Sequence, residues 1–251
     1  MNLRPVTRKS NTDIAREWDE IAIHRFRQIT SGRDLSYSHL LTPTILRLIG
    51  PSRVRRALDV GCGAGLLTKR LAAMSREIVG VDLSHVQISL ARQINARTGN
   101  ASFIASSLEA YARTNPEPFT LAIANMTLMT AIKLDRLLEA VRRLLARDAV
   151  FVLTITHPCF WPQYWGYANA PWFEYTREIF IEGYFRITLD KRSRFRTTHI
   201  HRSLEHYSRS LARHGFRIEA LQEPMPSKTM PKRYLKDWRE PRFLAMRCRR
   251  G

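Results

Sequence analysis

Short apolar segments alternate with amphipathic ones along most of the chain, and this alternation predicts a β-sheet covered by helices. Buried strands are predicted by the apolar segments 56–60, 77–82, 101–105, 119–126 and 149–156. Helices are predicted between them, where apolar residues recur at three- and four-residue spacing over 66–74, 84–94 and 134–145. Strands that alternate with helices are typical of a doubly wound α/β sheet, which binds its ligands at the carboxyl ends of the strands.

The same patterns extend to both ends of the chain. A helix is predicted over 12–30, capped at Ser10, Asn11 or Thr12 and ended by Ser31-Gly32, with a second short helix following over 40–49. The polar, basic residues before them are expected to be loose. A last helix over 203–212 and two closing strands at 216–221 and 242–248, expected as an antiparallel pair, complete the prediction.

The segment 157–200 differs from a plain crossover because it is rich in aromatic residues, proline and glycine. Residues 178–189 alternate like two paired strands that turn near Gly183. Five of its aromatic side chains are candidates for binding an apolar or planar substrate: Trp161, Tyr164, Trp165, Tyr167 and Trp172. The alternative is a small hydrophobic cluster that covers the sheet, and both roles are compatible.

Composition narrows the class of protein. A chain of 251 residues fits one α/β domain with an elaboration. Its apolar runs are too short to span a bilayer, and its basic N-terminus lacks the apolar core of a secretory signal, so a cytoplasmic protein without membrane contact is expected. The three widely spaced cysteines predict reduced thiols and no metal site.

The formal net charge of +19 has two interpretations. It could serve an anionic partner, such as RNA or a substrate with a carboxylate or phosphate group. Alternatively, it is a compositional bias of the surface. The arginines are spread along the whole chain rather than gathered in one run, which favours the second interpretation and leaves RNA open.

Three glycines follow the first predicted strand of the sheet. Gly61, Gly63 and Gly65 let the backbone turn sharply and let a ligand approach the main chain, at the start of a helix whose free N–H groups face it. An ordinary strand-to-helix turn is one explanation. A dinucleotide fingerprint is another, but it needs a third glycine where Leu66 stands.

With Asp59 two residues before the first glycine, this stretch resembles motif I of class I S-adenosylmethionine (SAM)-dependent methyltransferases. Asp82, at the end of the second strand, stands where a carboxylate can accept both hydroxyls of a ribose. The resemblance implies a Rossmann-like seven-stranded sheet (51–251), an N-terminal helical lid (1–50) and SAM as cofactor. It assigns cofactor binding to Tyr37, Asp59, Gly61, Cys62, Gly63, Gly65, Asp82, Leu83, Ser107, Leu108, Asn125 and Met126.

The chain departs from the family pattern at two places. Ser106-Ser107-Leu108 stands where an acid usually follows the third strand, and Asp148-Ala149 stands where Pro-Gly-Gly is common. Asn125-Met126, at the end of the fourth strand, lacks the form used on amino groups of nucleic-acid bases. This absence argues against base N-methylation.

His157 directly follows the fifth strand and is the candidate general base, because an imidazole can take a proton from a hydroxyl or amine near neutral pH. The alternative is a histidine bonded to the backbone beside Pro158. The resemblance thus implies methyl transfer to an oxygen or nitrogen of a small molecule. An RNA methyltransferase and a SAM-binding protein without transfer activity are the other hypotheses.

Overall fold

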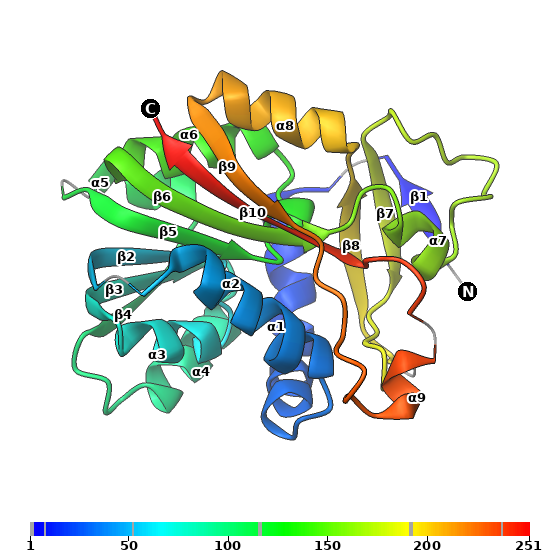
Figure 1. Cartoon of the computed structure of the whole chain (residues 1–251), viewed down its shortest axis with the longest axis horizontal. Helices are drawn as coiled ribbons and strands as arrows, with labels where there is room; N and C mark the ends of the chain where they lie inside the picture. Colours follow the sequence, from blue (N-terminus) through cyan, green and yellow to red (C-terminus); the bar gives the residue numbers. More distant parts are fainter. Residues whose placement is uncertain (1–2, 8, 52, 115–116, 191–192, 237) are drawn as a thin grey trace.

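Seven strands form the central sheet, in the order β4-β3-β2-β5-β6-β10-β9 (Figure 1). In the computed structural model, which describes residues 3–7, 9–51, 53–114, 117–190, 193–236 and 238–251, the strands are Val54–Val60 (β2), Ser75–Asp82 (β3), Ala101–Ala105 (β4), Phe119–Asn125 (β5), Leu145–Thr156 (β6), Phe216–Gln222 (β9) and Phe243–Arg250 (β10). β2 to β6 are parallel, and β10 is antiparallel to both neighbours. The predicted doubly wound, seven-stranded sheet is confirmed.

Helices cover both faces of this sheet (Figure 1). One face packs against α2 (Thr42–Ile49) and α3 (Leu66–Ala72). The opposite face packs against α5 (Leu108–Thr114), α6 (Leu134–Leu144) and α8 (Leu204–Arg213). α4 (His85–Ile94) packs on β4 through Ile88 and Ala91. Burying both faces leaves the carboxyl ends of the parallel strands as the open edge where a ligand can bind.

The N-terminal helix α1 (Asn11–Thr30) begins at Ser10, whose hydroxyl accepts a hydrogen bond from the Asp13 N–H, while the Asp13 carboxylate accepts one from the Ser10 N–H. The predicted second helix is longer than expected, because a π-helical segment, η1 (Ser36–Leu41), runs directly into α2. No described helix combines the length and the apolar character that crossing a bilayer requires.

A second sheet of three strands corrects two expectations. It consists of β1 (Arg4–Val6), β7 (Ile179–Tyr184) and β8 (Arg196–His201), all antiparallel. The N-terminal residues expected to be loose therefore include a strand, while residues 1, 2 and 8 lie outside the described part. Gly183, expected at a turn, lies within β7 opposite Thr197, where a Cβ would collide with Leu3.

Three short helical segments complete the described fold. η2 (Leu128–Thr130) is a 3₁₀ turn that follows β5, and α7 (Trp161–Trp165) follows β6. α9 (Lys232–Leu235) lies in the connection between β9 and β10. The three-stranded sheet and α7 lie beside the central sheet, past the ends of β6 and β10 (Figure 1).

Candidate active site

The bend after β2 is built from glycines that no other residue could replace without strain. Gly61, Gly63 and Gly65 have φ of +67°, +53° and +69°. A Cβ on Gly61 would collide with Thr127, whose hydroxyl donates to the Val60 carbonyl. A Cβ on Gly63 would meet no protein atom closer than 3.7 Å. The middle glycine thus exposes bare backbone, which a ligand can approach closely.

Asp82, at the end of β3, joins this bend to the next one. One carboxylate oxygen accepts the Gly63 N–H at 2.8 Å, and the other accepts the Ser84 N–H at 2.9 Å. Burial raises the pKa of Asp82, and the negative charge of Asp19 adds to this effect. A carboxylate offers about four acceptor positions, so both oxygens can still accept a hydrogen bond from a ligand hydroxyl.

A cavity of about 1090 Å³ lies above this edge of the sheet. Most of the residues predicted to bind a cofactor line it: Tyr37, Gly61, Cys62, Gly63, Asp82, Leu83, Ser107, Leu108, Asn125 and Met126. These residues come from η1, from the bends after β2, β3 and β5, and from the start of α5. The structure thus brings together in one cavity wall residues that lie up to 89 positions apart, from 37 to 126.

Two residues predicted to bind a cofactor do not line the cavity. Asp59 is 1% exposed, and its carboxylate accepts the Thr68 hydroxyl at 2.6 Å. Burial raises the pKa of Asp59 to about 7. Gly65 stands at the N-cap of α3, where a Cβ would collide with Phe103 and Asn95. Both residues support the bend from the protein interior and do not face the cavity.

The end of β5 carries backbone strain. Met126 has φ of +58°, a left-handed conformation that is rare for side chains other than glycine. Its N–H donates to the Thr154 carbonyl at 2.9 Å, and the Thr154 hydroxyl donates to the Asn125 side-chain carbonyl at 2.7 Å. These bonds hold the strained turn in place, and both Asn125 and Met126 line the cavity. Strain of this kind clusters at functional sites.

The serines after β4 serve the fold and also line the cavity. The Ser106 N–H donates to the Asp82 carbonyl at 2.9 Å, and the Ser107 hydroxyl accepts the Ala110 N–H at 3.2 Å. Both residues line the cavity beside Leu108. Serine oxygens and backbone groups therefore stand where the family pattern has an acid, as the sequence indicated.

Helix α1, which belongs to the N-terminal segment expected as a lid, lines the cavity through residues that the sequence did not single out. They lie near its start (Ser10, Asn11, Ile14, Ala15 and Trp18) and in its second half (Arg25, Phe26 and Ile29). Ile14 and Trp18 recur in the sequence at helical spacing, but such spacing does not reveal whether an apolar face packs on the core or on a ligand. Asp19, on the same helix, accepts hydrogen bonds from the Ser84 hydroxyl at 2.5 Å and the Val86 N–H at 3.0 Å.

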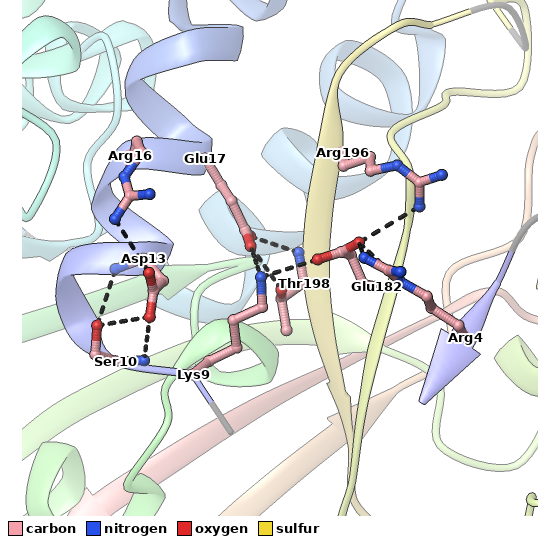
Figure 2. Close-up of polar contacts among 9 residues, drawn as sticks. All are labelled: Arg4, Lys9, Ser10, Asp13, Arg16, Glu17, Glu182, Arg196 and Thr198. Atoms are coloured by element: carbon pink, nitrogen blue, oxygen red, sulfur yellow. Dashed lines mark hydrogen bonds and ion pairs between the residues drawn. The ribbon is translucent and has the colours of Figure 1, made fainter. Parts of the chain in front are cut away.

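An ion cluster fastens α1 to the three-stranded sheet (Figure 2). The Lys9 ammonium lies 2.7 Å from Glu17 of α1 and 2.9 Å from Glu182 of β7. Glu17 also accepts the backbone N–H and the hydroxyl of Thr198, and Arg4 pairs with Glu182 at 2.7 Å. These bonds join the cavity wall made by α1 to the segment that follows β6.

The aromatic residues of that segment lie outside the cavity lining. Trp165 and Tyr167 are buried with Ile179 and Ile181 in a separate cluster, against which Trp161 and Trp172 pack. The Arg242 guanidinium lies 3.7 Å from the centre of the Tyr164 ring. The structure therefore places all five predicted substrate-binding aromatics in packing contacts, and their role in substrate binding stays a prediction.

His157 is 2% exposed and does not line the large cavity. Its Nδ1 accepts the Cys159 N–H at 3.2 Å, which assigns the proton to Nε2, and Nε2 donates to Glu223 at 2.7 Å. Both ring nitrogens are thus engaged. The sequence allowed a histidine held by the backbone beside Pro158, and this geometry favours that alternative; the role as general base stays a prediction.

Comparison with known proteins points to one family. Residues 57–148 match the methyltransferase domain family. A ubiquinone biosynthesis O-methyltransferase from Aliivibrio fischeri (strain MJ11) is 28% identical over 120 residues, which cover 47% of this chain and 49% of that protein. The chain thus matches about half the length of such relatives.

Solved structures share the fold over a longer stretch. An S-adenosylmethionine-dependent methyltransferase from Mesorhizobium loti superposes with a TM-score of 0.60 at 22% identity, covering 83% of this chain and 96% of that one. DhpI, in a DhpI-SAM-HEP complex, superposes with a TM-score of 0.65 at 16% identity, covering 97% of this chain and all of that one. The similarity therefore extends beyond the matched domain to the N-terminal helices and the segment after β6.

Proposed function

Because the chain belongs to the class I SAM-dependent methyltransferases, we propose that it methylates an oxygen atom of a small-molecule acceptor. The cofactor of this family, S-adenosylmethionine, is the methyl donor. The observation that carries the proposal is the pairing of Gly63 with Asp82. A bare backbone and a carboxylate with free acceptor positions lie side by side in the wall of one large cavity.

The residues present fit this cofactor. Asp82 can accept both ribose hydroxyls, as its position at the end of β3 indicates. Ser106 and Ser107 offer hydroxyl and backbone groups to an adenine ring, and Leu108 offers an apolar surface. Tyr37 lines the same cavity and could provide a polar group for the amino-acid end; Arg25 also lines it, but its charge is paired with Asp34. A cavity of about 1090 Å³ leaves room for an acceptor beside the cofactor.

Oxygen is the proposed acceptor atom because relatives that match the domain are named O-methyltransferases. When bound, the cofactor would supply a methyl group activated by a positively charged sulfur; its transfer to a hydroxyl oxygen would leave S-adenosylhomocysteine and release the hydroxyl proton to water. The chain holds the acceptor in line and excludes water. Asn125 and Met126 lie at the strand end that the family uses beneath the methyl group, and α1 covers the cavity above Asp82.

The test is a titration of the protein with S-adenosylhomocysteine by calorimetry, followed by transfer of labelled methyl groups to a panel of small phenols and hydroxy acids. We expect micromolar binding and a labelled ether or ester product. Asp82→Ala should abolish most of the binding, whereas Glu205→Ala, an exposed carboxylate on α8, should leave it unchanged. Unchanged binding by Asp82→Ala would refute the ribose assignment.

A SAM-binding protein without transfer activity is the second candidate. It is favoured by the two departures from the family pattern and by a histidine whose nitrogens are both engaged. Binding of S-adenosylhomocysteine with no labelled product from any acceptor of the panel would support it. Methyl transfer to even one acceptor, at a rate lost in Asp82→Ala, would exclude it.

A further inference from the structure

The cavity wall carries more positive than negative side chains. The acidic residues that line it are Asp82, Glu109 and Glu139. The basic residues are Lys9, Arg25, Arg113, Lys133, Arg136 and Arg143. The chain as a whole is strongly basic, so an excess of basic residues in the cavity wall does not by itself indicate an anionic ligand. What matters is which of these cations is already neutralised by the protein.

Two of the six basic side chains are committed to protein carboxylates. Lys9 lies between Glu17 and Glu182 (Figure 2). Arg25 donates to Asp34 at 2.5 Å. Each of these cations therefore has its charge balanced within the fold and adds little to the attraction of a ligand.

The other four, Arg113, Lys133, Arg136 and Arg143, are exposed, and in the described part of the chain none of them makes an ion pair or a side-chain hydrogen bond. Lys133 and Arg136 lie together at the start of α6. Asp135, which lies between them in the sequence, does not pair with either. Its carboxylate oxygens lie 2.9 Å from the Arg213 guanidinium and 3.7 Å from His214 Nδ1. The positive charges of Lys133 and Arg136 consequently stand in the cavity wall without a counter-ion among the described residues.

A run of lining residues along the chain connects them to the end of β5, where the proposed function places the methyl group. The cavity wall runs from Asn125 and Met126, at the end of β5, through the 130–132 segment to Lys133 and Arg136. Lys133 is the N-cap residue of α6, and no side chain caps this helix end. The free N–H groups of the first turn add partial positive charge to that of the two side chains.

Apolar side chains form another part of the wall. Ile14, Ala15 and Trp18 of α1 and Ile132 before α6 line the same cavity. A ligand that satisfies both parts of the wall needs an apolar or aromatic body and a negatively charged group. The wall formed by α1 favours a small molecule over a polymer, because the site is covered rather than an open surface track.

We propose that Lys133 and Arg136 bind a carboxylate or phosphate group of the acceptor and thereby select anionic, partly apolar acceptors. The inference rests on the proposed function, since it concerns the acceptor of the same site. Arg136 is suited to this role because its planar guanidinium can bind either group through two parallel hydrogen bonds. Lys133 adds a point charge beside it.

The experiment measures binding of matched probe pairs to the protein saturated with S-adenosylhomocysteine. 3,4-Dihydroxybenzoate is compared with 3,4-dihydroxybenzamide, and phenyl phosphate with phenol, so that each pair differs mainly in charge. Calorimetry is run on the wild type, on the double variant Lys133→Gln/Arg136→Gln, and on Arg97→Gln. Arg97 is exposed in a loop outside the cavity wall, so it controls for the loss of overall charge.

The wild type should bind at least one anion about tenfold more tightly than its neutral partner, as a lost charge-assisted hydrogen bond implies. The double variant should lose this preference, and Arg97→Gln should keep it. The exchange Lys133→Arg/Arg136→Lys retains both charges and should restore most of the affinity. Preference for the carboxylate or for the phosphate identifies the group that the acceptor carries.

Three results would overturn the inference. The first is equal binding of charged and neutral probes, or no binding of either anion at millimolar concentration. The second is an equal loss in Arg97→Gln. The third is a twelve-nucleotide RNA that binds more than a hundredfold more tightly than either anion and depends on Lys133 and Arg136, which would assign them to nucleic acid. Failure to bind S-adenosylhomocysteine would instead refute the proposed function.

Discussion

The Asp19 carboxylate of α1 accepts the Ser84 hydroxyl at 2.5 Å, two residues after the acid that the proposed function assigns to the ribose. The same oxygen accepts the Val86 N–H at 3.0 Å, and the Ser84 N–H donates to Asp82 at 2.9 Å. The helix that covers the cavity is therefore bonded to the bend that would hold the cofactor. One serine thus bonds both to α1 and to Asp82.

Asp19→Ala should consequently weaken binding of S-adenosylhomocysteine, although Asp19 does not line the cavity. The expected loss is about tenfold, the equivalent of one charge-assisted hydrogen bond of about 1.5 kcal/mol. Titration calorimetry measures it. Glu20→Ala, which removes an exposed carboxylate from the next position of α1, is the matched control. Equal affinities of both variants would show that α1 and the Asp82 bend act independently.

The glycines of the bend should respond differently to the same substitution. Gly61→Ala introduces a collision with Thr127 in addition to a positive φ, so it should lower the free energy of unfolding by about 1–3 kcal/mol beyond the strain of about 1–2 kcal/mol. Gly63→Ala meets no close protein atom and should show the strain alone, while its methyl group blocks the cofactor.

Urea unfolding and calorimetry separate these effects. Gly32→Ala is the reference for strain, because Gly32 has φ of +72° and a Cβ added there would have no atom within 4 Å. We expect Gly63→Ala to match Gly32→Ala in stability and to lose cofactor affinity. A Gly63→Ala protein that binds S-adenosylhomocysteine normally would contradict the close approach of a ligand to this backbone.

Asp59 should make stability depend on pH. Burial raises its pKa from an unfolded value of 3.8 to about 7, so the folded state holds a proton that the unfolded state has lost between these values. Stability from this group therefore falls as pH rises from about 4 to 7. Between pH 5 and pH 8 the wild type should lose about 2–3 kcal/mol relative to Asp59→Asn.

Urea unfolding of both proteins across this range tests the expectation, because other titrating groups are shared and cancel in the difference. Asp59→Asn keeps an oxygen that can accept the Thr68 hydroxyl, so the variant should fold. Parallel stability curves for the two proteins would mean that the Asp59 carboxyl has an ordinary pKa in the folded state.

Substitution of His157 distinguishes a structural role of this residue from a catalytic one. Because His157 is buried and both ring nitrogens are engaged, His157→Ala should lower the free energy of unfolding by about 1–3 kcal/mol, through the cavity left by the ring and the loss of its two hydrogen bonds. Methyl transfer per folded molecule should change less than about threefold. A general base would instead lose about 10²–10⁴-fold in turnover.

Glu223→Gln gives the second measurement for His157, since it removes the charge that faces Nε2 and keeps the shape of the side chain. If His157 is structural, this variant should retain the wild-type pH profile of methyl transfer. A profile whose lower limb shifts to higher or lower pH in Glu223→Gln would return His157 to the catalytic machinery.

The order of strands and helices in the central sheet could be predicted from the sequence because periodicity reports burial on a strand or helix directly. The expected positions of the glycine bend and of Asp82 also needed only local information. The positive φ at Gly61, Gly63 and Gly65 favours glycine at each position. Asp82 follows within about twenty residues, at the end of the next predicted strand, so its place could also be predicted. The predicted turn at Gly183 failed because a glycine also serves close packing, here against Leu3, and sequence does not separate these two uses.

The sheet, the bend and the resemblance to a methyltransferase family could be read from the chain alone, since each depends on neighbours in the chain or on a short motif. Which side chains meet across long separations became evident only from the packed fold. Glu223 engages His157 from 66 positions away, and Asp19 reaches Ser84 from 65. The aromatic segment after β6 packs on itself, while α1, Lys133 and Arg136 form the cavity wall. Such pairings depend on the packing of whole elements, which no local pattern encodes.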